Sequence, residues 1–338
     1  SSLPDGYSDG FGAEARRARL GVEGDIPGGF AYKMEIDFAT GEVELTDALI
    51  EYGAGPLDIT VGQFNNFQSM EELTSSRFTS FIERAAFTDA FGFSRRLGIA
   101  ADYGSGDVLL QMGVFHDNLA DLDGSNRVSV DGRAVYFPKI GEMQLHFGGS
   151  LHYADLGEGS LLRYRQRPLV HFTDERPVNT DRFDGDSEFG AGLEFAAIRG
   201  PLHFAAEGYR QQVGGTIGQD DAVFHGGYLE AGLFLTPGDS RGYSGGRFNR
   251  TRPARPVGEG GFGAVQLNVR YDYLDLVDDL IIGGTQNGYL ASLIWTTTDY
   301  SRLQVTYGRL EYDRAQELPT GERDYSADVI GVRAEFDF

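Results

Sequence analysis

The 338-residue chain contains no cysteine, which excludes a disulfide-stapled scaffold and any metal site with thiolate ligands. It has no apolar run of the roughly eighteen residues that a membrane-spanning helix needs. Positive charge is scarce: 29 lysine and arginine residues stand against 51 aspartate and glutamate residues, for a formal net charge of −22. Because binding to nucleic-acid phosphates requires a basic face, a nucleic-acid partner is not expected.

Motifs for catalysis and for cofactor binding are also scarce. The chain has no phosphate-binding loop with a Walker lysine and no His-Glu-x-x-His zinc motif. The sequence therefore predicts no catalytic residue, no metal site and no cofactor. A hydrolase built from a scattered Ser/His/Asp set stays open as an alternative, although nothing in the sequence points to it.

Apolar and polar residues alternate with a period of two through most of the chain. Within 262–274, Leu267 and Val269 share one face, whereas Gln266 and Arg270 share the other. This period places successive side chains on opposite faces of a strand. The expected strands are roughly ten to thirteen residues long, which suits a tilted membrane crossing. Their polar faces carry charges, which suits a water-filled lumen, so the pattern predicts a single all-β transmembrane barrel over residues 1–338.

Short and long connections alternate along the chain, as the periplasmic turns and outer loops of bacterial barrels do. This alternation fixes the direction of each strand. Strands toward the periplasm are expected at 13–24, 42–53, 94–103, 129–138, 188–198, 222–236, 287–298 and 325–338, and strands toward the outside at 29–40, 57–63, 108–116, 142–154, 201–213, 262–274 and 301–313. Single-chain bacterial barrels have an even number of strands. We therefore predict one further strand upstream of Ser1 and a 16-stranded antiparallel barrel, wide enough for an aqueous channel.

The long connections are the segments in which inward-folded loops are expected. The outer ones lie at 64–93, 117–128, 155–187, 275–286 and 314–324. Residues 77–84 have helical spacing and are too apolar for a freely solvated loop, so we expect 64–93 to fold inward as a constriction loop. We expect an inward arginine loop at 155–187. The connection 237–261 should be a short periplasmic turn but is long, and we expect it to reach the lumen from below.

Nearly all of the basic residues are arginines, since the chain has only two lysines, Lys33 and Lys139. Arginine suits planar, bidentate contact with phosphate or carboxylate. In an extended backbone Arg163, Arg165 and Arg167 would project from one side. Like charges so close repel one another and need anions, carboxylates or water to compensate. The row predicts either a ladder of anion sites or a solvated loop edge that is paired with nearby acidic residues.

Two further groups of arginines are candidates for the pore lining. Arg16, Arg17 and Arg19 fall on the first expected strand, where Arg17 and Arg19 would share a face. Arg247 and Arg252 belong to the long insertion at 237–261, which also carries three prolines.

Several motifs closely resemble those of the phosphate-selective porins of the O and P type, and the resemblance covers the whole chain. The matching segments are Arg16-Arg17-Ala18-Arg19-Leu20, Asp47-Ala48-Leu49-Ile50-Glu51-Tyr52, Ile59-Thr60-Val61-Gly62-Gln63-Phe64, Ser69-Met70-Glu71-Glu72-Leu73-Thr74-Ser75-Ser76-Arg77-Phe78, Phe81-Ile82-Glu83-Arg84, Arg95-Arg96-Leu97-Gly98, Leu235-Thr236-Pro237-Gly238, Arg247-Phe248, Arg252-Pro253 and the terminal Phe338. The resemblance implies a homotrimeric, anion-selective channel of the Gram-negative outer membrane, surrounded by lipids and lipopolysaccharide.

The resemblance also implies roles for single residues. In the family one inward loop narrows the pore, and a ladder of arginines leads to a constriction lined by lysines. Arg77 and Arg252 fall at positions of such pore lysines, so arginine replaces lysine there. The residues that match the ladder are Arg16, Arg17, Arg163, Arg165 and Arg167, and Arg247 lies close to Arg252 in the insertion.

The sequence thus predicts a passive outer-membrane porin for small anions, with phosphate or pyrophosphate favoured. The alternative is a structural outer-membrane protein. In that case the acidic loops would bind divalent cations, lipopolysaccharide or a surface-layer partner, and permeation would be secondary.

Overall fold

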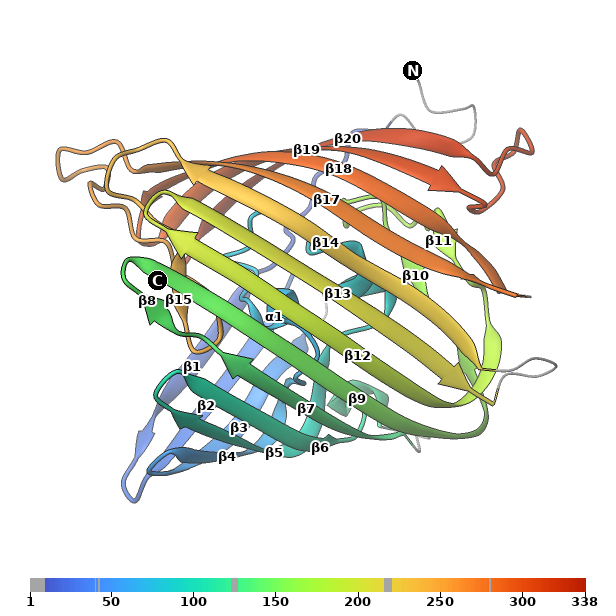
Figure 1. Ribbon diagram of the computed structural model, residues 1–338, viewed down its shortest axis with the longest axis horizontal. Helices are drawn as coiled ribbons and strands as arrows, with labels where there is room; N and C mark the ends of the chain where they lie inside the picture. Colours follow the sequence, from blue (N-terminus) through green and yellow to red (C-terminus); the bar gives the residue numbers. More distant parts are fainter. Residues whose placement is uncertain (1–9, 40, 42, 123–126, 216–220, 280) are drawn as a thin grey trace.

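The computed structural model describes residues 10–39, 41, 43–122, 127–215, 221–279 and 281–338. It is almost entirely β-structure, with one antiparallel sheet of 16 strands that curves into a barrel (Figure 1). Fifteen strands follow one another in chain order from β1 to β20, and each pairs with its neighbours along the chain. The sixteenth, β8 (Lys139–Ile140), is a two-residue strand that pairs with β9 beside this path. The prediction of an all-β antiparallel barrel is confirmed.

The elements have the following bounds. The strands of the main path are β1 (Arg19–Ile26), β2 (Phe30–Asp37), β3 (Glu44–Ala54), β4 (Leu57–Asn65), β5 (Arg95–Ser105), β6 (Val108–Phe115), β7 (Val128–Tyr136), β9 (Met143–Leu162), β12 (Phe183–Arg199), β13 (Leu202–Gly214), β14 (Ala222–Phe234), β17 (Ala264–Asp278), β18 (Ile281–Thr298), β19 (Ser301–Asp313) and β20 (Tyr325–Phe336). Two small hairpins are β10 (Arg165–Gln166) with β11 (Val178–Asn179), and β15 (Gly242–Ser244) with β16 (Arg247–Asn249). The helical elements are α1 (Met70–Leu73), α2 (Ala86–Ala90) and the 3-10 turn η1 (Leu119–Asp121). No helix of the described residues has the length and apolar character to cross a membrane.

Burial along the strands is the reverse of that in a water-soluble protein. On β17 the polar Gln266, Asn268 and Arg270 are buried, whereas the apolar Leu267 and Val269 between them are exposed. The same alternation runs along β14 and β19. An apolar outer face and a polar inner face are what a barrel in a bilayer requires. The period of two in the sequence therefore gives the sheet its lipid face and its lumen face.

The expected strands match the observed ones closely, with two corrections. The segment 275–286 is not a loop, because β17 continues to Asp278 and β18 begins at Ile281. Leu274 and Leu276 are fully buried and alternate with the less buried Asp275 and Val277, so the strand pattern simply continues. In the same way β9 and β12 extend into the segment 155–187 and leave only 163–182 as the loop.

The second correction concerns the first strand, which begins at Arg19 rather than at residue 13. The prediction that Arg16 and Arg17 lie on this strand is therefore wrong. Arg16 instead forms an ion pair with Glu83 of the segment between β4 and β5. The backbone N–H of Ala18 donates to a carboxylate oxygen of Asp37. The chain before Arg19 therefore lies outside the β-sheet and contacts the segment between β4 and β5.

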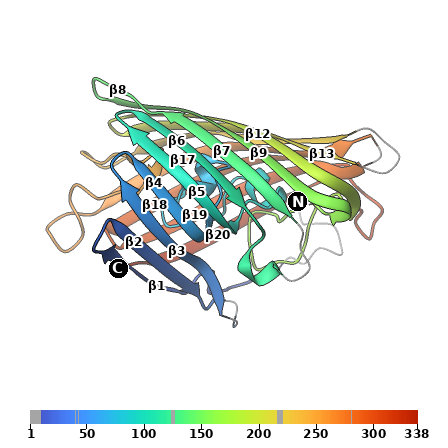
Figure 2. The same cartoon turned by 90° about the horizontal axis from the view of Figure 1, so that it is seen from below.

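Residues 66–94, between β4 and β5, form an inward loop that carries both helices and lies within the barrel (Figures 1 and 2). Met70, Phe81 and Phe87 of this loop are buried. The inward loop packs closely against glycines of the barrel wall, which is the sheet. A Cβ on Gly226 of β14 would come within 2.4 Å of the Phe87 Cβ, and one on Gly331 of β20 would come within 2.1 Å of the Ile82 Cδ1. The absence of these wall side chains leaves the space that the loop fills.

Candidate functional site: arginines inside the barrel

The lumen face of the wall carries buried arginines whose charge is neutralised by acidic neighbours. Arg133 of β7 bonds to Glu194 of β12 at 2.6 Å, and His146 contacts the same carboxylate at 3.0 Å. Arg270 of β17 bonds to Glu230 of β14, also at 2.6 Å. Sequence reasoning did not single out these wall arginines, although their places on the polar faces of alternating strands were the available signal. Because each has a carboxylate partner, these residues fix the wall rather than attract a mobile anion.

A buried carboxylate of the wall holds the start of the inward loop. Glu207 of β13 accepts hydrogen bonds from the Ser69 hydroxyl at 2.8 Å, from the Met70 N–H at 2.9 Å and from the Glu71 N–H at 2.7 Å. Free N–H groups at the start of a helix favour a negative charge. The Tyr228 hydroxyl donates to the same carboxylate at 2.9 Å. Glu207 is thus an anchor for α1.

A group of four arginines, the inner arginine group, lies where the chain before β1 meets the inward loop and β20. It consists of Arg16, Arg17, Arg84 and Arg333. Arg16 pairs with Glu83 at 2.9 Å, and Arg84 donates to three backbone carbonyls of the loop. Arg17 is different, because its buried Nη1 has no hydrogen-bond partner among the described residues. Burial, together with the neighbouring Arg16 charge, lowers the pKa of Arg17 to about 9. Arg333 and Arg84 act in the same direction, and the Glu83 charge opposes them.

The loop at 163–182 holds the predicted arginine row. Arg163 donates from Nε to the Asn179 side chain at 2.9 Å. Arg165, on β10, is exposed. Arg167 lies 4.0 Å from the Asp89 carboxylate at α2. Burial lowers the pKa of Arg176, and so do the charges of Arg167 and Arg165, so these three arginines lie near one another. The structure brings Arg165 and Arg167 together with Arg176, which sequence reasoning missed.

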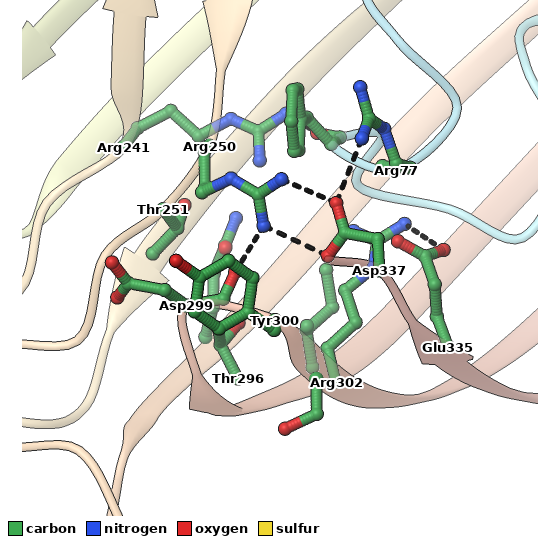
Figure 3. Close-up of a pocket in the computed structure, with 14 residues that line it drawn as sticks. Arg77, Arg241, Arg250, Thr251, Thr296, Asp299, Tyr300, Arg302, Glu335 and Asp337 are labelled. Carbon is green, nitrogen blue, oxygen red and sulfur yellow. Dashed lines mark hydrogen bonds and ion pairs between the residues drawn. The ribbon is translucent and has the colours of Figure 1, made fainter. Parts of the chain in front are cut away.

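Two arginines from distant parts of the chain meet at Asp337, directly after β20 (Figure 3). Asp337 accepts a bond from Arg77 of the inward loop at 2.9 Å and a bidentate pair from Arg250 of the insertion. Partial burial alone would raise the pKa of Asp337. The hydrogen bonds and charges of the two arginines prevail and hold this pKa below its usual value. Both guanidinium groups also lie over the Phe78 ring, at 5.3 Å and 5.2 Å from its centroid.

The two predicted arginines of the insertion lie in different surroundings. The Arg252 side chain is 77% exposed, and its Nε lies 3.7 Å from the Asp299 carboxylate at the turn between β18 and β19. Arg247, on β16, is close to Arg133 of the wall. Burial and the Arg133 charge lower the pKa of Arg247, and the charge of Asp102 opposes them. The structure therefore places Arg252 near Arg250, at the turn between β18 and β19. It places Arg247 beside the wall arginine Arg133.

Known proteins match this chain over nearly its whole length. The family described as phosphate-selective porin O and P matches residues 3–338. A Caulobacter vibrioides protein is 47% identical over 350 residues, which cover 99% of this chain and 71% of the relative. Porin O of Pseudomonas aeruginosa is 23% identical over 365 residues, which cover 96% of this chain and 81% of the relative.

Solved structures show the same fold at low sequence identity. The anion-selective porin from Comamonas acidovorans has a TM-score of 0.56 at 12% identity, and Pseudomonas putida OprB has 0.58 at 14%; each match covers 95% of this chain and 87% of the other. A trimer form of Vibrio cholerae OmpT has 0.54 at 9% identity, over 95% of this chain and 91% of that one. The chain therefore belongs to the phosphate-selective porin O and P family and is a β-barrel protein of the Gram-negative outer membrane.

Proposed function

We propose that this porin is a passive channel for small anions, with phosphate or pyrophosphate as the favoured cargo. The observation that carries the proposal is the inner arginine group. Arg17 lies among three other guanidinium groups, and its buried Nη1 has no hydrogen-bond partner within the described chain. A cation in such surroundings gains most from an anion that approaches it.

The arrangement of the arginines also suits release. The outer cluster of Arg165, Arg167 and Arg176 and the inner arginine group lie at different elements, and Arg77 and Arg250 lie at Asp337. Conduction requires several sites that bind favourably but weakly enough to let the ion leave. Guanidinium groups match the geometry of phosphate oxygens and stay charged at physiological pH. The description of the family as phosphate-selective agrees with this preference.

Planar-bilayer recordings with chloride and phosphate gradients test the proposal. We expect a reversal potential of anion-selective sign, and we expect Arg17→Glu to shift it toward zero. The matched control is Arg199→Glu, because Arg199 is the exposed last residue of β12 and lies on the outer face. A cation-selective reversal potential of the wild-type protein would end the proposal.

We further infer that the channel works as a homotrimer in contact with outer-membrane lipids and lipopolysaccharide. A trimer form is known for the structural neighbour OmpT, and the apolar outer face of β14 to β19 suits either lipid or a neighbouring copy. The mass of the detergent-solubilised protein, measured by light scattering, should equal three chains. A mass of one chain would refute the trimer.

We infer that the protein carries out no catalysis. Residues Gly242–Gly246 match the Gly-x-Ser-x-Gly motif of hydrolases by letter, and in those enzymes the serine lies on a turn between a strand and a helix. Here the motif covers β15 and its turn to β16, and the Ser244 hydroxyl accepts a bond from Asn249. An esterase assay in detergent should show no activity above that of a Ser244→Ala variant.

A further inference from the structure

We propose that the lipid-facing side of β13, β14, β17, β18 and β19 binds one molecule of lipid A, the phosphorylated glycolipid of lipopolysaccharide. The end of an acyl chain would lie in a hollow of the outer face, and a phosphate would lie at Arg210 and His225. The inference rests on the proposed contact with lipopolysaccharide and gives that contact a place. It concerns the outside of the barrel and does not depend on which ion passes through the lumen.

The outer hollow is a depression of about 480 Å³ in the apolar face that β13, β14, β17, β18 and β19 form side by side (Figure 1). Its floor is a row of small side chains, because Ala231 of β14 lies opposite Val269 of β17, which in turn lies opposite Ala291 of β18. Phe204 of β13 and Tyr307 of β19 occupy the two ends of this row. The floor is therefore lower than the surface at either end.

Larger side chains stand along both long sides of the floor, and all of them are exposed on the outer face. They are Leu229, Tyr271 and Tyr289 on one side and Leu233, Leu267 and Leu293 on the other. In a bilayer the hydrophobic effect does not distinguish this lining from the surrounding lipid, since lipid tails are equally apolar. The hollow instead offers van der Waals contact on several sides to a hydrocarbon chain that fills it.

The outer hollow lies midway across the apolar band of the barrel. On β17 the outward-facing side chains are apolar from Val265 to Tyr273, and Val269 is in the middle of this stretch. Arg210 follows Phe204 by six positions on β13, which is about 20 Å along the strand and roughly 14 Å along the membrane normal at a tilt of about 45°. Half of the hydrocarbon core is about 15 Å. An acyl chain whose headgroup lies beside Arg210 therefore ends at the level of the hollow.

Arg210 and His225 are cross-strand partners on β13 and β14, where the apolar band ends. The end of β13 that carries Arg210 faces outward, because the turn at its other end, after β12, is short as periplasmic turns are. Arg210 is half-buried, and its Nη1 donates to the Gln212 Oε1 at 2.7 Å. Within the described part of the chain it makes no ion pair closer than 4.0 Å. An arginine at the level of the headgroups attracts lipid phosphate.

The groups around Arg210 suit a phosphorylated sugar better than a phosphate alone. The Gln212 Nε2 donates to the Asp221 carboxylate, and Asp275 of β17 lies opposite His225. Two carboxylates beside the cations repel a second phosphate, but they accept hydrogen bonds from hydroxyl groups. A sugar that carries one phosphate and several hydroxyls supplies both kinds of partner, as each sugar of lipid A does.

The surface between the headgroup position and the outer hollow is open along β13. The outward-facing positions between Phe204 and Arg210 are Ala206 and Gly208. Gly208 lies opposite Gly227 of β14, and a Cβ at Gly208 would meet nothing within 4 Å. An acyl chain can therefore lie against nearly bare backbone from the headgroup to the hollow.

Native mass spectrometry of the detergent-solubilised protein with added lipid A measures the binding. Ala231→Leu combined with Ala291→Leu fills the hollow and should raise the Kd about tenfold, which is the effect of losing on the order of ten van der Waals contacts. Ala134→Leu is the matched control, because Ala134 is exposed on β7, outside the hollow. It should leave the Kd unchanged.

Arg210→Gln tests the headgroup position. It should raise the Kd of lipid A about tenfold, which corresponds to one charge-assisted hydrogen bond. The Kd of dephosphorylated lipid A should not change. Arg199→Gln is the matched control, because Arg199 is exposed at the other end of the wall, and it should affect neither lipid. All of these side chains lie outside the lumen, so an unchanged single-channel conductance shows that the variants are folded.

Four results would separate the proposals. Equal weakening of both lipids by Arg210→Gln, or an unchanged Kd in the filled-hollow variant, would overturn the site. A lower mass of the filled-hollow variant in light scattering would also overturn it, because a second copy of the chain would then occupy the hollow. Lipid A that binds equally to the wild type and to all variants would leave the contact with lipopolysaccharide standing and refute its place. A cation-selective channel with the expected lipid binding would refute the proposed anion channel and leave the site standing.

Discussion

Replacing Glu207 by glutamine should release the start of the inward loop. The carboxylate accepts four hydrogen bonds, two at each oxygen: Ser69 and Met70 donate to one, and Glu71 and Tyr228 donate to the other. Glutamine turns one oxygen into an NH₂ donor, so two bonds are lost along with the charge. Hydrogen bonds to charged groups contribute about 1.5–3 kcal/mol each. A loss of about 3 kcal/mol corresponds to a shift on the order of a hundredfold in the equilibrium between the docked and the released α1.

Hydrogen exchange followed by mass spectrometry measures this shift. The N–H groups of Met70 and Glu71 should exchange about a hundredfold faster in Glu207→Gln. The effect should stay local, because other contacts hold the far end of the loop: the Ala86 N–H donates to Asp272, and Ser80 donates to Glu230 at 2.5 Å. Peptides from 85–93 should therefore exchange at the wild-type rate.

Glu51→Gln is the matched control for this experiment. Glu51 lies on β3, and its electrostatic neighbours are Asp58, Thr60 and Asp102 of the wall. Its loss removes one carboxylate without touching α1. Unchanged exchange at Met70 and Glu71 in Glu207→Gln, or equal acceleration in both variants, would refute the claim that this carboxylate anchors the helix.

Three further outcomes are expected. Because the pKa of Asp337 is held below its ordinary value of 3.8, its pairs with Arg77 and Arg250 persist above that pH and are lost as the pH falls through the depressed pKa. Anion selectivity should then rise in acid, and the Asp337→Asn variant should show no such rise. Gly226→Leu should displace Phe87 and change the single-channel conductance, whereas Gly208→Ala, which meets nothing within 4 Å, should not. Arg163→Glu combined with Arg165→Glu should reduce anion selectivity, and an unchanged reversal potential would show that these residues do not line the path.

The strands could be predicted from the sequence because their pattern is local. A period of two sets the lumen face and the lipid face residue by residue, and the alternation of short and long links sets direction. The prediction failed at 275–286, where a long outer connection was expected. The buried Leu274 and Leu276 show that the strand pattern of β17 continues there.

The candidate site was predicted only in part because it depends on contacts between distant segments. Spacing alone drew attention to Arg163, Arg165 and Arg167, since they lie close together in the chain. It could not show that Arg77 and Arg250 meet at Asp337, because this depends on where the inward loop and the insertion reach the end of β20. Nor could it show that Arg270 has two acidic partners, Glu71 and Glu230, which lie 199 and 40 residues away.

The ion pairs that Arg77 and Arg250 form with Asp337 have a consequence for the order in which the barrel assembles. Arg77 and Asp337 are 260 residues apart, so their bond closes one of the longest loops that the chain can form. Contacts of such separation form late, because the loop-closure entropy must be overcome first. The inward loop and the insertion can reach their final positions at the periplasmic end only after the last strand has joined the sheet. The contact between the inward loop, the insertion and the end of β20 is then formed late, and a barrel in which β20 has not yet paired lacks the ion pairs that hold these two segments together.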